Sequence, residues 1–93
     1  MVATHILQRF YRELVLLQKL ALDNKRERFK KVYKLFEEDY VKNCFLSEDP
    51  LAGLCDSVKN HFYYTLIYPD ERQEQLRKGA EELKELGDYL RTP

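Results

Sequence analysis

Histidine and cysteine are the side chains in this sequence that are best suited to bind a metal ion. There are two of each, His5, His61, Cys44 and Cys55, and they stand far apart in the chain. Metal sites built from these residues use short spacings such as Cys-X-X-Cys or His-Glu-X-X-His, because ligands on one turn or helix then converge on the ion. Neither spacing occurs, so the sequence does not predict a metal centre. With two cysteines we expect free thiols rather than a disulfide framework.

Nucleophilic catalysis and phosphate binding also lack a motif. No serine or cysteine stands between glycines, as it would in the sharp turn that exposes a catalytic nucleophile. Gly53, Gly79 and Gly87 all fall inside segments with helical periodicity and do not form a phosphate-binding loop. Adjacent acids such as Glu81 and Glu82 are expected on a solvated helix face. We therefore predict that the protein is not an enzyme.

The charged residues are balanced in number but unevenly distributed. Sixteen Lys and Arg match sixteen Asp and Glu, which argues against nucleic-acid binding driven by bulk charge, and we expect no direct, sequence-specific nucleic-acid partner. Residues 1–43 hold ten basic and six acidic residues, whereas residues 44–93 hold six and ten. The basic residues concentrate at 25–34, where Glu27 alone opposes them. Charge alone leaves two interpretations open, a solvated helix face or a docking surface for an acidic protein.

Four segments show helical periodicity and none shows the alternation of a β-strand. The first spans about Thr4 to Leu22, with Thr4 as the expected N-cap. Its apolar stripe is broad, so we expect it to contact more than one neighbour. The second begins near Asn24, because Asn24 and Glu27 have the spacing of a capping box. A loop is expected over residues 44–49.

The third and fourth helices have clear start signals. Asp49-Pro50 is typical of an N-cap followed by proline at the first helical position, and it predicts a helix over residues 50–66. Tyr68-Pro69 ends that helix, and acids at the next positions open a last helix up to Leu90. No apolar run is long enough to predict a transmembrane segment. We predict one all-α domain over residues 1–93, a small antiparallel helical bundle.

Three short motifs resemble those of the LYR-motif (complex 1 LYR-like) proteins. Residues 6–14, ILQRFYREL, resemble the family's opening helix, with Phe10-Tyr11-Arg12 in place of Leu-Tyr-Arg. The last helix resembles the family's third helix in its leucine, its glycine three residues on, and its further spaced leucines. The members of that match are Leu76, Gly79, Leu83 and Leu86.

The second helix offers two matches to the family's aromatic residue, which a basic residue and an Asn or His follow. Phe36 fits the distance from the triplet, whereas Tyr40 fits the local pattern, Tyr-Val-Lys-Asn. The resemblance covers roughly residues 4–43 and 70–91. Because the family usually has three helices, residues 50–66 look like an insertion. The resemblance therefore implies a LYR-like three-helix core with an extra helix between its second and last helices.

The resemblance also implies a function. LYR proteins are non-enzymatic adaptors that bind the mitochondrial acyl carrier protein, whose acidic helix docks on basic residues of the first two helices. The carrier supplies a 4′-phosphopantetheine arm with an acyl chain, which inserts between the LYR helices, so no cofactor is bound directly. Members are accessory subunits or assembly factors of a larger mitochondrial complex in the respiratory chain, iron–sulfur delivery or the mitoribosome. Such a protein resides in the mitochondrial matrix or on the matrix side of the inner membrane.

Carried onto this chain, the resemblance assigns two sets of residues. Basic residues at the docking edge, with the tyrosine of the triplet, would meet carboxylates and phosphate: Tyr11, Arg12, Lys19, Arg28, Lys30, Lys31 and Lys34. Apolar residues would line the acyl tunnel: Phe10, Leu14, Leu17, Phe36, Tyr40, Leu76, Gly79 and Leu83. The same apolar positions also suit an ordinary packed core.

Two other classes of protein fit the sequence. One is a helical structural subunit of a large assembly without lipid, whose basic and acidic halves meet different neighbours. The other is a small immunity- or antitoxin-like binding module. Residues 50–66 are either a plain core helix or, through Phe62, Tyr63, Tyr64 and the nearby Tyr68, a surface for a specific client.

Overall fold

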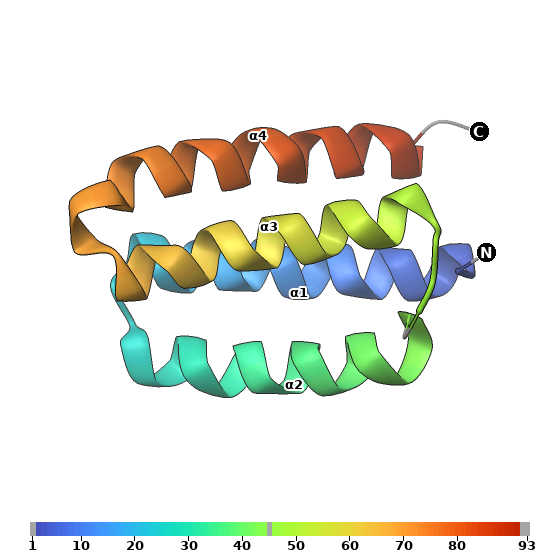
Figure 1. Ribbon diagram of the computed structural model, residues 1–93, viewed down its shortest axis with the longest axis horizontal. Helices are drawn as coiled ribbons and strands as arrows, with labels where there is room; N and C mark the ends of the chain where they lie inside the picture. The colour runs from blue at the N-terminus through green and yellow to red at the C-terminus, as the bar shows by residue number, and fades with distance from the viewer. Residues whose placement is uncertain (1, 45, 92–93) are drawn as a thin grey trace.

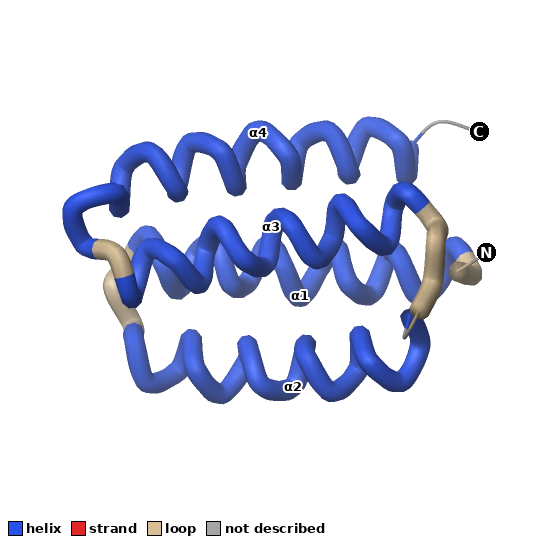
Figure 2. The backbone as a smooth tube through the Cα atoms, in the orientation of Figure 1, coloured by secondary structure: helices blue, strands red, loops and turns tan. Residues whose placement is uncertain are grey.

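The computed structural model describes residues 2–44 and 46–91. Its helices are α1 (Thr4–Leu22), α2 (Arg26–Cys44), α3 (Pro50–Ile67) and α4 (Arg72–Arg91), with a short 3-10 turn, η1 (Pro69–Glu71), before α4. Consecutive helices run antiparallel (Figure 1), and the described residues form helices and loops without a strand (Figure 2). The predicted all-α bundle is confirmed.

Helix α1 occupies the centre of the arrangement. It contacts α2, α3 and α4, as its broad apolar stripe predicts, while α2 and α4 lie on opposite edges of the bundle (Figure 1). The described residues of α2 and α4 do not contact each other, and α2 touches α3 at few points. Helices α3 and α4, by contrast, pack closely along their length. Helix α2 is therefore attached to the bundle chiefly through α1.

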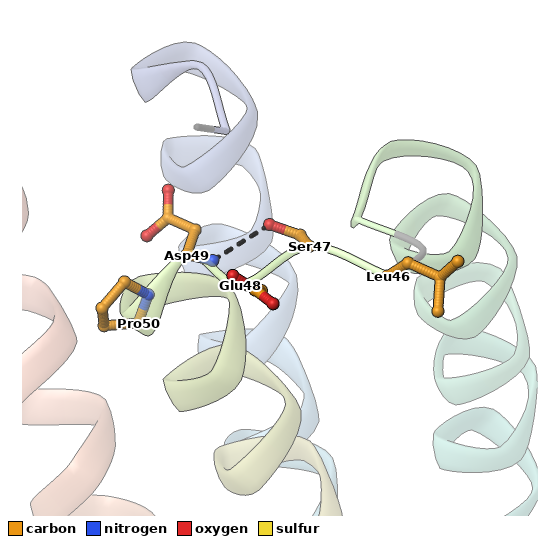
Figure 3. Close-up of a pocket in the computed structure, with 5 residues that line it drawn as sticks. All are labelled: Leu46, Ser47, Glu48, Asp49 and Pro50. Atoms are coloured by element: carbon orange, nitrogen blue, oxygen red, sulfur yellow. Dashed lines mark hydrogen bonds between the residues drawn. The ribbon is translucent and has the colours of Figure 1, made fainter.

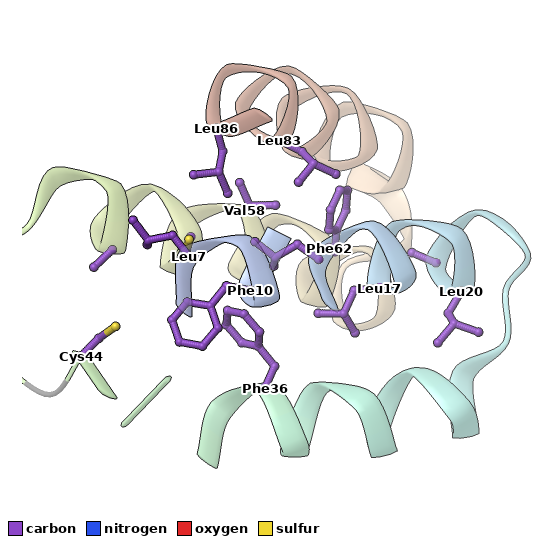
Figure 4. Packing of buried hydrophobic residues seen from close by; sticks show 14 of the residues in the cluster. Leu7, Phe10, Leu17, Leu20, Phe36, Cys44, Val58, Phe62, Leu83 and Leu86 are labelled. Atoms are coloured by element: carbon purple, nitrogen blue, oxygen red, sulfur yellow. The ribbon is translucent and has the colours of Figure 1, made fainter. Parts of the chain in front are cut away.

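One apolar cluster joins all four helices. Its largest fully buried side chains are Phe10, Phe29, Phe36 and Phe62. The rings of Phe10 and Phe36 have centroids 5.2 Å apart and are tilted by 60°, and Figure 4 shows them facing each other between α1 and α2. Each side chain of this size stabilises the fold by roughly 1.5–3 kcal/mol when it is removed from water. The bundle is thus held together by this shared core.

At the helix N-termini, the structure confirms one predicted cap and corrects another. Asp49 caps α3 as predicted, its side chain accepting a hydrogen bond from the Leu51 N–H at 2.9 Å. Thr4 was wrong as the cap of α1, because Ala3 is the N-cap and makes no side-chain bond. The reason lies one residue earlier, since the buried Val2 donates its N–H to Asp49 at 3.0 Å and fixes how the chain approaches α1.

The predicted capping box at Asn24 is also wrong. Asn24 has a φ of 55° and ends α1 instead of starting α2. The Lys25 N–H bonds the Leu20 carbonyl and the Asn24 N–H bonds the Ala21 carbonyl, which is the Schellman pattern at a helix C-terminus. Asparagine tolerates this left-handed conformation better than most residues. Arg72 then donates to the Ala21 carbonyl at 2.7 Å, and α1 ends well satisfied.

Two glycines let aromatic rings from other helices lie against α4. A Cβ at Gly79 would stand 2.5 Å from Cε1 of Phe62 on α3. A Cβ at Gly87 would stand 3.0 Å from both Cε2 and Oη of Tyr11 on α1. The first distance is too short for a real Cβ, and the second would require the Tyr11 ring to shift by a few tenths of an ångström. These glycines therefore set the close approach of α4 to its two neighbours.

Candidate docking face and apolar core

The outer side of the α1–α2 pair carries much of the predicted docking set. An ion pair fixes the register of the two helices, because Arg9 Nε and Nη2 donate to the Asp39 carboxylate at 2.8 and 2.7 Å. Phe10 and Phe36 pack on the inner side of the same pair. Helical periodicity then places a set of exposed residues on its outer side, which we name the α1–α2 face. They are Arg12, Leu16 and Lys19 of α1 and Arg28, Lys31 and Leu35 of α2.

The α1–α2 face is positive and partly apolar. Among the described residues, no carboxylate lies within ion-pair distance of its four cations, Arg12, Lys19, Arg28 and Lys31. Leu16 and Leu35, between them, are 40% and 63% exposed. Exposed apolar side chains among uncompensated cations suit a partner that offers carboxylates around an apolar contact.

Two carboxylates, Asp39 and Glu13, lie near this face. Asp39 is held by Arg9, and Asn43 also donates to it at 2.9 Å. Glu13 is half-buried, and its Oε2 has no hydrogen-bond partner among the described residues. Burial and the nearby Asp39 raise the pKa of Glu13, while Arg9 and Arg12 oppose that rise. Neither carboxylate forms an ion pair with the four cations of the face.

The other predicted docking residues lie elsewhere. Lys30 and Lys34 project from the side of α2 away from α1, and Lys30 stands 3.9 Å from Glu27. Tyr11 turns toward α4, where its ring covers Gly87. It lines a surface groove of about 370 Å³ between α1 and α4, and Arg12 borders both this groove and the α1–α2 face. The structure thus brings four of the seven predicted docking residues together.

The predicted tunnel residues come together as a packed core. Phe10, Leu14, Leu17 and Phe36 are fully buried and Leu83 is nearly so. Tyr40 and Leu76 pack against the same cluster while partly exposed, and the ring of Phe62 fills the space beside Gly79. The set is Phe10, Leu14, Leu17, Phe36, Tyr40, Leu76, Gly79 and Leu83. Its members touch one continuous apolar interior, as either a tunnel or an ordinary core requires.

Hollows large enough for a small molecule lie at the surface. One of about 550 Å³ runs along residues 46–50, in the loop before α3 (Figure 3). Another, of about 420 Å³, lies between the start of α3 and Tyr89 near the end of α4. Neither is lined by a predicted tunnel residue. An acyl chain between Phe10 and Phe36 would have to separate rings that now touch.

Both candidates for the family's second-helix aromatic contact the opening helix. Phe36 is fully buried, with its ring 5.2 Å from that of Phe10. The Tyr40 ring lies 5.9 Å from Phe10, and its hydroxyl donates to the Ala52 carbonyl of α3 at 3.0 Å. Phe36 thus belongs to the core alone, whereas Tyr40 also connects α2 to α3.

Helix α3 combines a core face with an aromatic outer edge. Phe62 is fully buried on its inner side. Tyr63 and Tyr64 are half-buried, Tyr68 is exposed, and ring contacts run from Tyr33 of α2 through all three. Residues 50–66 therefore include a core helix face, as one interpretation predicts, while a client surface at the tyrosines stays a prediction.

A polar cluster between α3 and α4 was missed by the sequence reasoning. Ser57 Oγ donates to Glu82 at 2.6 Å, and His61 Nε2 lies 3.1 Å from the same carboxylate. His61 Nδ1 pairs with Gln75 Oε1 at 2.7 Å. A serine hydrolase needs its histidine against the serine hydroxyl, but here the carboxylate stands between them. The spacing of Ser57 and His61, one helical turn, was the available signal.

A buried lysine was also missed. Lys59 of α3 is 6% exposed and binds Glu37 of α2 at 2.7 Å and Asp56 at 2.8 Å. Burial alone would lower the pKa of Lys59, but its hydrogen bonds to Asp56 and Glu37 outweigh that effect and raise it. The lysine is therefore a charged group inside the α2–α3 contact. Its place among the apolar Cys55, Val58 and Phe62 was the signal in the sequence.

The cysteines and the possible metal ligands show no sign of reactivity among the described residues. Cys44 and Cys55 are free and buried, and burial raises the pKa of the Cys55 thiol to about 12, which keeps it protonated. Within residues 2–44 and 46–91, no three His, Cys, Asp or Glu side chains gather in a way that could hold a metal ion. In the same part of the chain, no helix combines the length and apolarity needed to cross a membrane.

Comparison with family models, with curated proteins and with solved structures found no match for this chain. Among the described features, the α1–α2 face is the best candidate for a partner-binding surface.

Proposed function

We propose that this chain is a non-enzymatic, LYR-like adaptor that binds mitochondrial acyl carrier protein. The observation that carries the proposal is the α1–α2 face, where four unpaired cations surround two exposed leucines within the described residues. The Phe10-Tyr11-Arg12 triplet and the Leu76-Gly79-Leu83 pattern suggest which acidic partner that is. In this proposal the chain acts in the mitochondrial matrix as an accessory subunit or assembly factor of a larger complex.

Docking on this face follows from charge and shape. An acidic helix laid along the α1–α2 pair would place carboxylates opposite Arg12 and Lys19 on one side and Arg28 and Lys31 on the other. Arginine can fork onto a carboxylate or phosphate, so Arg12 and Arg28 would fix the orientation. Leu16 would give the helix an apolar contact. Opposite potentials of this kind chiefly speed association and select the partner.

The acyl chain would be held by the apolar side chains of the core. Phe10, Leu14 and Phe36 offer the chemistry that such a chain prefers, and each buried CH₂ would contribute roughly 0.8 kcal/mol. The phosphopantetheine arm, which the carrier supplies, is the group that would present the chain. Because these side chains now touch, the chain would enter by separating them.

A second candidate function is favoured by that closed core. A helical subunit of a large assembly would use the same positive face without taking up lipid, and it needs no space between Phe10 and Phe36. The two candidates differ in what the partner must carry. The adaptor requires an acylated prosthetic group, whereas the structural subunit does not.

Calorimetry with purified acyl carrier protein in its apo, holo and acylated forms tests the proposal. We expect the acylated form to bind most tightly, and Arg28→Glu/Lys31→Glu to weaken it at least about tenfold through lost charge complementarity. The matched control is Lys30→Glu/Lys34→Glu, which makes the same charge change on the same helix but off the face. The proposal fails if no form binds. Equal binding of all three forms would favour the lipid-free subunit.

A further inference from the structure

The contact between α2 and α3 is small, and polar groups form much of it. Helix α2 buries Phe29, Phe36 and Cys44, and its main attachment is to α1. The interactions that cross from α2 to α3 include an ion pair, two hydrogen bonds and a ring stack. These are Glu37 with Lys59, Tyr40 Oη with the Ala52 carbonyl at 3.0 Å, Arg26 Nη2 with the Leu66 carbonyl at 3.2 Å, and Tyr33 with Tyr63 at 4.6 Å.

Lys59 lies at the middle of this contact. Its ammonium stands 2.7 Å from Glu37 Oε1, 2.8 Å from Asp56 Oδ1 and 5.7 Å from the centre of the Tyr33 ring. Glu37 and Asp56 keep 34% and 41% of their side-chain surface exposed. Water can therefore reach both carboxylates at the edge of the contact, although it barely reaches the lysine.

Polar contacts of this kind are easy to separate. A buried ion pair is close to break-even against hydration, and hydrogen bonds lost on opening are replaced by bonds to water. Apolar contacts, such as those of Phe62 with α4, have no such compensation. The α2–α3 contact is consequently the part of the bundle with the least resistance to opening.

We propose that α2 separates from α3 along this contact while it stays attached to α1, and that an apolar chain of the fatty-acyl class reaches the core through the opening. Lys59 and Glu37 form the latch. Figure 4 shows Phe36 and Phe62 among the buried side chains of the two helices that would part, so both would be near an incoming chain. The nature of the ligand rests on the proposed function, whereas the opening itself does not.

The lysine explains why the latch can open. A methionine at position 59 would keep the length of the side chain but remove its charge, and it would turn the contact into a continuous apolar one. Glu37 and Asp56 would stay hydrated because both are partly exposed. Lys59→Met should therefore hold α2 against α3 more firmly. Glu37→Gln should do the opposite, because it leaves the buried ammonium with one carboxylate.

Native-state hydrogen exchange followed by NMR tests the opening. In the wild type we expect amides in the middle of α2 to exchange at least about tenfold faster than those of α3 and α4, because they open without global unfolding. Lys59→Met should slow the α2 amides, and Glu37→Gln should speed them. The matched control, Lys78→Met, removes an exposed lysine from α4 and should leave α2 unchanged. Equal exchange rates for the amides of α2 and α3 in the wild type would overturn the proposal. So would α2 exchange rates that are the same in the wild type, Lys59→Met and Glu37→Gln.

Titration with laurate tests the ligand separately. We expect laurate to shift NMR signals of Phe36 and Phe62, and to do so more slowly in Lys59→Met than in the wild type. If α2 opens but laurate leaves these signals unchanged, the route for an apolar chain is wrong. Docking of the carrier protein is measured independently by calorimetry, so a failure of one proposal does not imply a failure of the other.

Discussion

Gly79 and Gly53 are both helical glycines, but their surroundings differ completely. The Phe62 ring covers Gly79, whereas nothing lies within 4 Å of a Cβ built at Gly53. We predict that Gly79→Ala lowers the free energy of unfolding by about 1–3 kcal/mol through overpacking. Gly53→Ala, the matched control, should raise it by about 0.5–1 kcal/mol because alanine favours the helix. Urea unfolding of both variants measures this, and stabilisation by Gly79→Ala would mean that α4 has room beside Phe62.

Glu13 gives a prediction about pH. Its pKa is raised above the ordinary 4.5, first by burial and then by Asp39, so the folded protein holds this proton more tightly than the unfolded chain does. Ionised Glu13 therefore destabilises the fold, and this effect grows as the pH rises through the window above 4.5. Glu13→Gln should be more stable than the wild type at neutral pH and lose that advantage in acid. Urea midpoints across pH measure it, and a constant difference would contradict the assignment.

Single residues were the hardest feature to predict from the sequence. Asn24 suits both an N-cap and the left-handed position at a helix end, so its type alone did not decide between them. Lys59 lies at a buried position because Glu37 of another helix meets it there, and no local pattern announces such a partner. Periodicity identified Phe10, Leu14 and Phe36 as interior positions, but an apolar stripe is the same for a packed core and for a lipid tunnel.

At the scale of elements, the start of α3 depends on Asp49. Its carboxylate accepts hydrogen bonds from the Val2 and Leu51 N–H groups, which lower its pKa below the ordinary 3.8. A lowered pKa means that the ionised group stabilises the fold above that range, and this contribution is lost as the pH falls through the folded-state pKa. We predict that Asp49→Ala costs about 1 kcal/mol at neutral pH, a typical N-cap effect.

Thermal unfolding of Asp49→Ala and wild type from neutral to acid pH measures this cap. The difference in stability should narrow toward acid. Its sign is opposite to that for Glu13→Gln, because here the wild type is the more stable protein at neutral pH. A matched control is Glu48→Ala, one residue earlier, because Glu48 is exposed and does not cap the helix. A difference that widens in acid would show that the carboxylate is not what stabilises this helix start.

Helix bounds followed closely from the sequence, and the docking face only partly. Apolar spacing and the Asp49-Pro50 signal were sufficient to place the helices, because these are local properties. The face required the register of α2 against α1, which the Arg9–Asp39 pair sets. With α2 held in this orientation, Arg28 and Lys31 lie on the α1–α2 face, whereas Lys30 and Lys34 lie on the side of α2 away from α1, although all four are close in the chain.

At the scale of the whole molecule, the surplus basic residues of positions 1–43 and the surplus acidic residues of positions 44–93 lie in different kinds of element. Helices α3 and α4 each carry equal numbers of acidic and basic residues. The surplus acids of the second half lie in the connections, Glu48 and Asp49 before α3 and Asp70 and Glu71 after it, at opposite ends of the bundle (Figure 1). The basic surplus gathers on α1 and the first half of α2. The basic surplus thus lies largely on two neighbouring helices, which favours an acidic partner on the α1–α2 face.

Native mass spectrometry tests the adaptor function most directly, with the tagged protein purified gently from its own cells. We predict a complex with a small acidic protein whose mass includes phosphopantetheine and a fatty acyl chain. Arg28→Glu/Lys31→Glu should lose this partner, while Lys30→Glu/Lys34→Glu should retain it. A bare protein, or a partner that lacks the prosthetic group, would contradict the adaptor and leave a helical interaction module that handles no lipid.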